Sequence, residues 1–278
     1  MICVVCGVKW GMPVEQDLKQ LEEKSIFILR ETKSRFKKPA MMWSTGKDST
    51  TMVHMMRKAF FGKPVFPLIH LDNGLEFAES YAFRDRMVKE WGLNLIVGKM
   101  EVKKGHEDAN VSGVSCCGVN KADALKKVLD DNGFDAVVVS IRRDEHGIRS
   151  KERIFSPRDK EFKWDYKNQP AEIWEFTSQI EGTSHVRVHP LLPWNEIDVW
   201  RYTKQENIPV NPLYFSRGGK RFRSLGCTEC TVSIDSKASN VDEIIEELRS
   251  SSTAERAGRA MDKEKENVMQ RLRALGYM

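Results

Sequence analysis

Short apolar runs alternate with segments of helical spacing along the first half of the chain. The apolar runs predict buried strands at residues 40–43, 64–72, 93–97 and 135–141. Apolar positions recur every three or four residues between these runs, which predicts helices at 15–36, from Met52 onward, at 77–91 and at 121–129. Strands that alternate with helices imply right-handed crossovers and a parallel sheet covered on both faces. The pattern therefore predicts an α/β fold with a Rossmann-like parallel sheet.

The pattern changes after residue 150. Residues 151–179 are polar and aromatic without a clear period, and helical spacing returns at 196–206 and 241–248. Residues 253–275 are charged with sparse apolar positions, and we expect a surface helix or an interaction arm there. These changes predict an N-terminal segment and helix (1–36), a central domain (37–235) and a mostly helical C-terminal extension (236–278).

Composition suits a soluble protein. The 278 residues are 40% hydrophobic and 31% charged, with a formal net charge of +5. No apolar run approaches the about 20 residues that span a bilayer, and the first residues lack the basic region of a secretory signal. We therefore expect a cytoplasmic protein without a membrane partner. The charge permits a polyanionic partner, and the basic segment 217–223 fits either a phosphate contact or a solvated loop.

A small, polar loop follows the first predicted strand. Gly46 lets the backbone approach a ligand, Lys47 supplies a point charge, and the first amides of the next helix favour an anion. The alternative is a helix capped by Ser or Thr with an incidental glycine, since the glycine spacing differs from that of the common phosphate loop. The candidate nucleotide-binding residues are Ser44, Thr45, Gly46, Lys47, Asp48, Ser49 and Thr50.

The Ser-x-Gly-Lys-Asp-Ser segment resembles the pyrophosphate loop of the N-type ATP pyrophosphatases, which cleave ATP between the α and β phosphates. Loops after parallel strands open on one edge of the sheet, so we expect residues after positions 43, 71 and 141 to meet there. Asp72 could hold a Mg²⁺ ion that bridges phosphates, and Arg142 and Arg143 could neutralise charge on the leaving pyrophosphate. Alternatively, Asp72 caps the next helix and the arginines pair with nearby acidic residues.

Further segments extend the resemblance over most of the chain. Residues 21–262 resemble the small subunit of bacterial sulfate adenylyltransferase, within the adenylylsulfate and phosphoadenylylsulfate reductase superfamily. The matching segments lie at 44–49, 71–74, 83–86, 142–145, 151–153, 164–169, 213–214, 225–227 and 252–256. The resemblance implies an adenine nucleotide α-hydrolase-like fold that uses ATP and Mg²⁺ and transfers or releases AMP. It implies catalytic roles for Lys47, Asp72, Arg142 and Arg143, with residues 37–235 as the ATP pyrophosphatase domain.

Four of the six cysteines form two close pairs, Cys116 with Cys117 and Cys227 with Cys230. Four thiolates are the right number and type for an iron–sulfur cube or a tetrahedral zinc ion, and the alternative is four buried apolar cysteines. The pairs resemble the [4Fe–4S] ligands of adenylylsulfate reductases and depart from the sulfate adenylyltransferase small subunit. The chain ends without the nucleophilic cysteine of those reductases, and Cys3 and Cys6 have no assigned role.

This combination resembles the iron–sulfur ATP pyrophosphatase of DNA phosphorothioation systems. The resemblance implies activation of a DNA backbone phosphate for sulfur incorporation. The implied partners are a cysteine desulfurase, other proteins of such a system and DNA. The alternative is a sulfate adenylyltransferase small subunit that makes adenylylsulfate together with a GTPase large subunit. A scaffold that senses ATP or redox state and a tRNA-thiolating enzyme also remain open.

Overall fold

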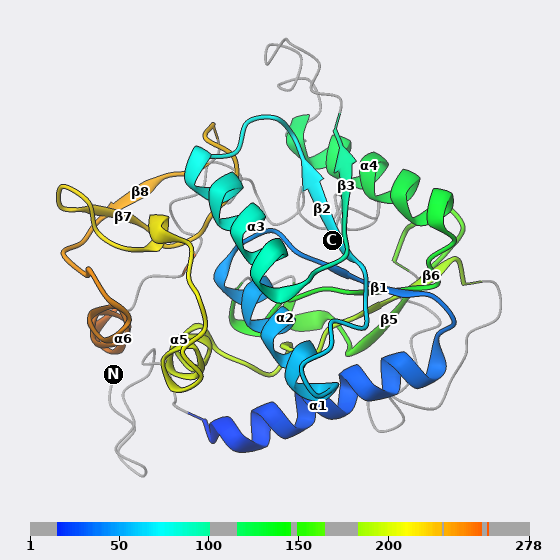
Figure 1. Ribbon diagram of the computed structural model, residues 1–278, viewed down its shortest axis with the longest axis horizontal. Coiled ribbons are helices and arrows are strands. Elements are labelled where there is room, and N and C mark those ends of the chain that lie inside the picture. The colour runs from blue at the N-terminus through cyan, green and yellow to red at the C-terminus, as the bar shows by residue number, and fades with distance from the viewer. Residues whose placement is uncertain are drawn as a thin grey trace.

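The centre of the protein is a six-stranded sheet. We describe it from a computed structural model that covers residues 16–100, 116–145, 149–164, 183–229, 231–251 and 255. The strand order is β3-β2-β1-β4-β6-β5 (Figure 1). Neighbouring strands are parallel except for β5, which pairs antiparallel with β6. The strands are β1 (Pro39–Met42), β2 (Leu68–Asp72), β3 (Leu95–Lys99), β4 (Ala136–Val138), β5 (Phe155–Arg158) and β6 (His185–Val188).

Helices cover both faces of this sheet, because alternate side chains of each strand point to opposite sides. Met41, Leu68 and Val138 belong to the large core beneath α1, α2 and α3. Ala40, Ile69 and Val137 belong to a second core beneath α4. These helices are α1 (Leu18–Arg35), α2 (Lys47–Ala59), α3 (Ala78–Trp91) and α4 (Cys116–Asn132). The predicted Rossmann-like α/β class is therefore confirmed.

The C-terminal part of the described chain packs beside the sheet. Helix α5 (Glu196–Gln205) and helix α6 (Val241–Ser250) share an apolar cluster that includes Trp200 and Ile244. Between them lie the antiparallel strands β7 (Lys220–Phe222) and β8 (Ser233–Asp235). Short 3-10 helices occur at Arg143–Glu145, Arg149–Lys151 and Pro212–Tyr214. The helices expected at 196–206 and 241–248 are confirmed, and the three-part division of the chain stays a prediction.

Several predicted boundaries were wrong. The strand expected at 93–97 is shifted to Leu95–Lys99, and the one expected at 135–141 is only Ala136–Val138. Strand β5 lies in the segment 151–179, for which the sequence predicted no strand. Both faces of this strand are buried. Its polar face is buried as well, where Ser156 and Arg158 bond to the carboxylate of Glu152 at 2.8 and 3.2 Å. No helix in the described ranges is long and apolar enough to cross a membrane.

The position of β1 determines where a ligand can bind. The chain passes from β1 to β2 and β3 on one side, and it then returns to β4 on the other side of β1. Loops that leave the carboxyl ends of β1 and β4 therefore run in opposite directions, and such a switch point is where ligands bind in open α/β sheets. The loop at 44–46 and the segment that begins with Arg142 both lie at this point.

Candidate phosphate-binding site

The loop between β1 and α2 is held by its own side chains. The Ser44 N–H donates to Ser49 Oγ at 3.2 Å, and Ser49 Oγ donates to the Gly46 carbonyl at 3.1 Å. Thr45 adopts a left-handed backbone with φ of 59°, which a β-branched residue rarely adopts and which is common at functional loops. Gly46 precedes α2, and no side chain caps the helix there. The predicted strand, loop and helix are confirmed, and the alternative of a helix capped by Ser or Thr is wrong.

The first amide of α2 already binds an oxygen atom. The Lys47 backbone N–H donates to the hydroxyl oxygen of Tyr214 at 2.9 Å. Tyr214 is buried, and burial raises the pKa of its hydroxyl to about 12, so the group stays neutral. A Cβ atom on Gly46 would lie 3.3 Å from the same hydroxyl oxygen. Glycine therefore permits the close approach of an oxygen to the start of α2.

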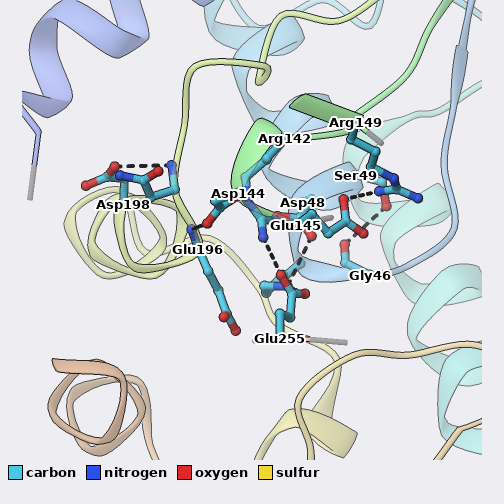
Figure 2. Close-up of polar contacts among 12 residues, drawn as sticks. Gly46, Asp48, Ser49, Arg142, Asp144, Glu145, Arg149, Glu196, Asp198 and Glu255 are labelled. Carbon is cyan, nitrogen blue, oxygen red and sulfur yellow. Dashed lines mark hydrogen bonds and ion pairs between the residues drawn. The ribbon is translucent and has the colours of Figure 1, made fainter. Parts of the chain in front are cut away.

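Two buried cations meet at this end of the sheet, and Figure 2 shows one of them, Arg142, beside Glu255. The Lys47 ammonium contacts Asp48 at 3.1 Å and also contacts Glu255. The Arg142 guanidinium contacts Asp144 at 2.9 Å and also contacts Asp48 and Glu255. The side chains of Lys47 and Arg142 are 1% and 0% exposed. The segments after β1 and β4 thus supply one cation each to a single cluster.

The charges in this cluster stabilise one another. Burial opposes the charge of Lys47, but the carboxylates of Asp48 and Glu255 outweigh it and raise the Lys47 pKa well above its usual value. Burial likewise opposes the charge of Glu255, but Arg142 and Lys47 hold the Glu255 pKa well below its usual range. Both cations and Glu255 are therefore charged at neutral pH, and each cation is already paired with carboxylates.

A second layer of contacts joins the cluster to α5 and β7. The carboxylate of Asp144 accepts the backbone N–H of Glu196, the first residue of α5, at 2.7 Å. The Glu196 carboxylate in turn binds the guanidinium of Arg223, at 2.7 Å from Nη2 and 3.1 Å from Nε. Burial raises the pKa of Glu196, and the nearby negative charge of Glu255 adds to this effect. The basic segment 217–223 therefore contributes one arginine to the support of the site.

Asp72 lies at the end of β2, away from these cations. Its Oδ1 accepts the Tyr81 hydroxyl at 2.7 Å and the Gly74 N–H at 2.8 Å. Burial raises its pKa, but these two hydrogen bonds outweigh burial and lower it. Asp72 does not cap α3, whose N-cap is Phe77, so that alternative was wrong. Its role as a Mg²⁺ ligand stays a prediction.

Arg142 and Arg143 have different positions. Arg142 lies in the cluster, and its expected pairing with Asp144 is confirmed. The Arg143 backbone N–H donates to the Leu192 carbonyl at 3.1 Å, and the role of Arg143 in neutralising charge on the leaving pyrophosphate stays a prediction. Glu255 was not predicted as a site residue. Its only signal in the sequence was its place within the matching segment 252–256.

The cysteine pairs belong to elements that meet near Glu76. Thr228, next to the buried Cys227, donates its backbone N–H to the Leu75 carbonyl at 2.8 Å. Burial raises the pKa of Glu76 to about 7, and Lys121 and Cys227 both act on this carboxyl group through their charges. Helix α4 contains Lys121 and ends a few residues before the amino end of β4. The start of α4, with Cys116, therefore lies toward the opposite, carboxyl edge of the sheet.

Of the four cysteines predicted to bind a cluster, the structure describes the side chain of Cys227. Among the described side chains, no group of three or more His, Cys, Asp or Glu could hold a metal ion. Cys230 and the side chains of Cys116 and Cys117 lie outside the described residues. The segment 253–275 also lies outside them, except for Glu255. The four-cysteine site therefore stays a prediction.

The comparisons with known proteins agree with this geometry. Residues 38–233 match the family described as the phosphoadenosine phosphosulfate reductase domain. The chain belongs to this family. Sulfate adenylyltransferase subunit 2 of Azospirillum brasilense is 42% identical over 94% of this chain and 98% of that protein. The protein of the same name from Marinomonas sp. is 39% identical over 94% of this chain and 97% of that protein. The predicted superfamily is confirmed, and so is the relationship to adenylyl-transferring enzymes of sulfur metabolism.

Solved structures support the fold of this phosphoadenosine phosphosulfate reductase domain. The FMN adenylyltransferase of Candida glabrata in complex with ATP has a TM-score of 0.54 and 19% identity, over 80% of this chain and 66% of that chain. The phosphoadenylyl-sulfate reductase of Candida auris in complex with phosphate has a TM-score of 0.51 and 16% identity, over 80% of this chain and all of that chain. At these identities the likeness concerns the fold alone.

Proposed function

We propose that the chain binds ATP and transfers its AMP group to an oxyanion, with sulfate as the acceptor. The observation that carries the proposal is the pair of buried cations, Lys47 and Arg142, at the switch point of the sheet. The full-length similarity to sulfate adenylyltransferase subunit 2 supports sulfate as the acceptor. The name of these relatives also supports a second subunit as partner, for which we propose the GTPase large subunit.

The proposed reaction makes one bond and breaks one bond. An acceptor oxygen attacks the α phosphorus of ATP, and the bond from that phosphorus to the α–β bridging oxygen breaks. Pyrophosphate leaves with the electron pair, so negative charge grows on the leaving group. The Lys47 ammonium and the amides of α2 that follow Lys47 would bind its oxygens, and Arg142 would offset the growing charge.

Mg²⁺ is the cofactor expected for this chemistry, and Asp72 fits the role of a ligand. Both hydrogen bonds to its carboxylate reach Oδ1, so the arrangement leaves Oδ2 for a cation. Asp72 also keeps its negative charge at neutral pH, because these hydrogen bonds hold its pKa low. When bound, the ion would neutralise phosphate charge. Its omission from the assay should abolish turnover.

The test is the exchange of labelled pyrophosphate into ATP, with and without sulfate, in the presence of the large subunit. Lys47→Ala should lower the rate by about 100-fold or more, since one lost donor to a developing charge costs that much. Lys58→Ala is the matched control, because Lys58 lies on the same helix but pairs with Glu22 and Glu206 away from the site. A Lys47→Ala variant with wild-type activity would exclude the assignment.

The cysteines favour a second candidate, the activation of a DNA backbone phosphate for sulfur incorporation. In support, Cys227 is buried in a loop bonded to Leu75, and α4 begins with Cys116 at the same edge of the sheet. We infer that Cys116, Cys117, Cys227 and Cys230 hold a [4Fe–4S] cluster, with zinc as the alternative. The donor set is chemically suited to either, and the cluster would supply redox or sulfur-transfer chemistry beside the nucleotide.

Metal analysis separates the two candidates. Protein purified without oxygen should contain about four iron and four acid-labile sulfide per chain, and both should be lost in Cys227→Ser. Cleavage of ATP to AMP that depends on DNA and a cysteine desulfurase, and is insensitive to sulfate, would then support the DNA reaction. Bound zinc would make the cysteines structural. The absence of any metal would leave sulfate adenylyltransferase as the only candidate of the two.

A further inference from the structure

Glu255 bridges the two buried cations of the site. Its Oε1 contacts the Lys47 ammonium, and its Oε2 contacts the Arg142 guanidinium (Figure 2). The Glu255 side chain is only 4% exposed. One carboxylate therefore reaches both cations at once, so Lys47 and Arg142 are close enough to share a single small anion. A phosphoryl group is such an anion, because lysine and arginine bind its oxygens as they bind those of a carboxylate.

The balance of charge in the cluster opposes a further anion. Lys47 and Arg142 contact three carboxylates, those of Asp48, Asp144 and Glu255, which leaves a net charge of −1. A phosphoryl group added to this arrangement would meet repulsion in a buried setting, where charges are weakly screened. Binding of the phosphates of ATP at these cations therefore requires one carboxylate to give up its contacts.

Two of the three carboxylates belong to regular structure. Asp48 is in the first turn of α2, where a negative charge is favourable. Asp144 is in a 3-10 helix and also accepts the first N–H of α5. Glu255 lies beyond the end of α6 at Ser250, outside the described helices and strands, and its carboxylate contacts Lys47 and Arg142. Glu255 is thus the carboxylate that can leave with the least disturbance of the fold.

We propose that Lys47 and Arg142 together bind one phosphoryl group, and that Glu255 occupies the place of this group until the nucleotide displaces it. The inference rests on the function proposed above. It assigns both cations to one and the same phosphoryl group of the nucleotide. A molecule in which Glu255 contacts the cations does not bind ATP there. The apparent affinity for ATP is therefore the intrinsic affinity multiplied by the fraction of molecules in which Glu255 has left the cations.

The test compares the binding of inorganic pyrophosphate to the wild-type chain, Glu255→Gln and Glu247→Gln by calorimetry, without Mg²⁺. Glu255→Gln should bind pyrophosphate about 10-fold more tightly, as expected when a competitor present in about nine molecules of ten is removed. Glu247→Gln is the control, since Glu247 pairs with Arg221 outside the cluster, and its affinity should equal that of the wild type. Lys47→Ala combined with Glu255→Gln should lose the gain.

The outcomes are distinct. Equal or weaker binding by Glu255→Gln, in a chain whose wild type binds ATP, would overturn this inference and would make Glu255 a residue that positions the two cations. If neither the wild type nor any variant binds ATP or pyrophosphate, the proposed function fails together with the inference. Glu255→Asp covers the case in which the glutamine variant does not fold. Its shorter side chain cannot bridge both cations, so its affinity should lie above that of the wild type.

Discussion

The hydroxyl of Tyr214 links the 3-10 helix at Pro212–Tyr214 to the start of α2, and its removal gives a direct test of the site. Tyr214→Phe deletes the one oxygen that accepts the Lys47 N–H at 2.9 Å. The ring keeps its edge-on contact with Trp200, at 5.3 Å between centroids, so packing is preserved. The loss is then that of a buried amide left without an acceptor, which costs about 1–3 kcal/mol.

Urea unfolding followed by tryptophan fluorescence measures this loss. The midpoint should fall while the slope with urea stays the same, because the surface exposed on unfolding is unchanged. Tyr202→Phe is the matched control, since its hydroxyl donates to Glu22 at 2.6 Å and Glu22 retains its pairing with Lys58. We expect a smaller loss in the control. A loss below about 0.5 kcal/mol in Tyr214→Phe would refute the reasoning, because the Lys47 amide would then have another acceptor.

Two further predictions concern stability. Gly98→Ala should destabilise the fold by about 1–3 kcal/mol in urea unfolding, since its Cβ would lie 2.8 Å from Val128 and 2.9 Å from Leu71, and Val128→Ala should restore part of the loss. Burial lowers the pKa of His189 to about 4, so between pH 6.5 and 4 the unfolded chain binds a proton that the folded chain does not. The free energy of unfolding should therefore fall as the pH falls, and His189 alone should account for about 2 kcal/mol of this loss at pH 5. A His189→Asn variant with the same pH dependence as the wild type would contradict the assignment.

Much of the fold could be predicted from the pattern of neighbouring residues in the sequence. The apolar run before Ser44 and the polar break after it are adjacent in the sequence, so the strand, loop and helix could be predicted from neighbours alone. Lys47 and Arg142 are 95 residues apart in the chain, yet the rule that ligands bind at the carboxyl ends of parallel strands placed them together. One general rule of topology was therefore enough to predict that these two residues lie close together, while their role in binding stays a prediction.

Other features depend on contacts that no local pattern records. Glu255 is 208 residues from Lys47, and in the sequence it is one acidic residue among many in a charged segment. Strand β5 has four residues and both of its faces are buried, although one face is polar. The burial of Ser156 and Arg158 depends on their bonds to Glu152, which the sequence does not reveal. Asp72, the last residue of β2, was predicted to bind an ion. In the structure its carboxylate accepts the Gly74 N–H and the Tyr81 hydroxyl, two contacts that the local pattern did not predict.

The central position of β1 has a consequence for local unfolding. The backbone of Met41 and Trp43 bonds to the β2 side at 3.0 and 2.9 Å, while β4 pairs with the opposite edge of the strand. Amides in a strand with neighbours on both sides exchange with solvent only in rare, near-global openings. The proposed phosphate-binding loop at 44–47 is thus attached to a strand whose amides we expect to exchange slowly. Glu255 is buried against both cations but lies outside the sheet, beyond the end of α6. If the proposed displacement of Glu255 is correct, a ligand can therefore exchange at the site while the loop that holds Lys47 stays attached to β1.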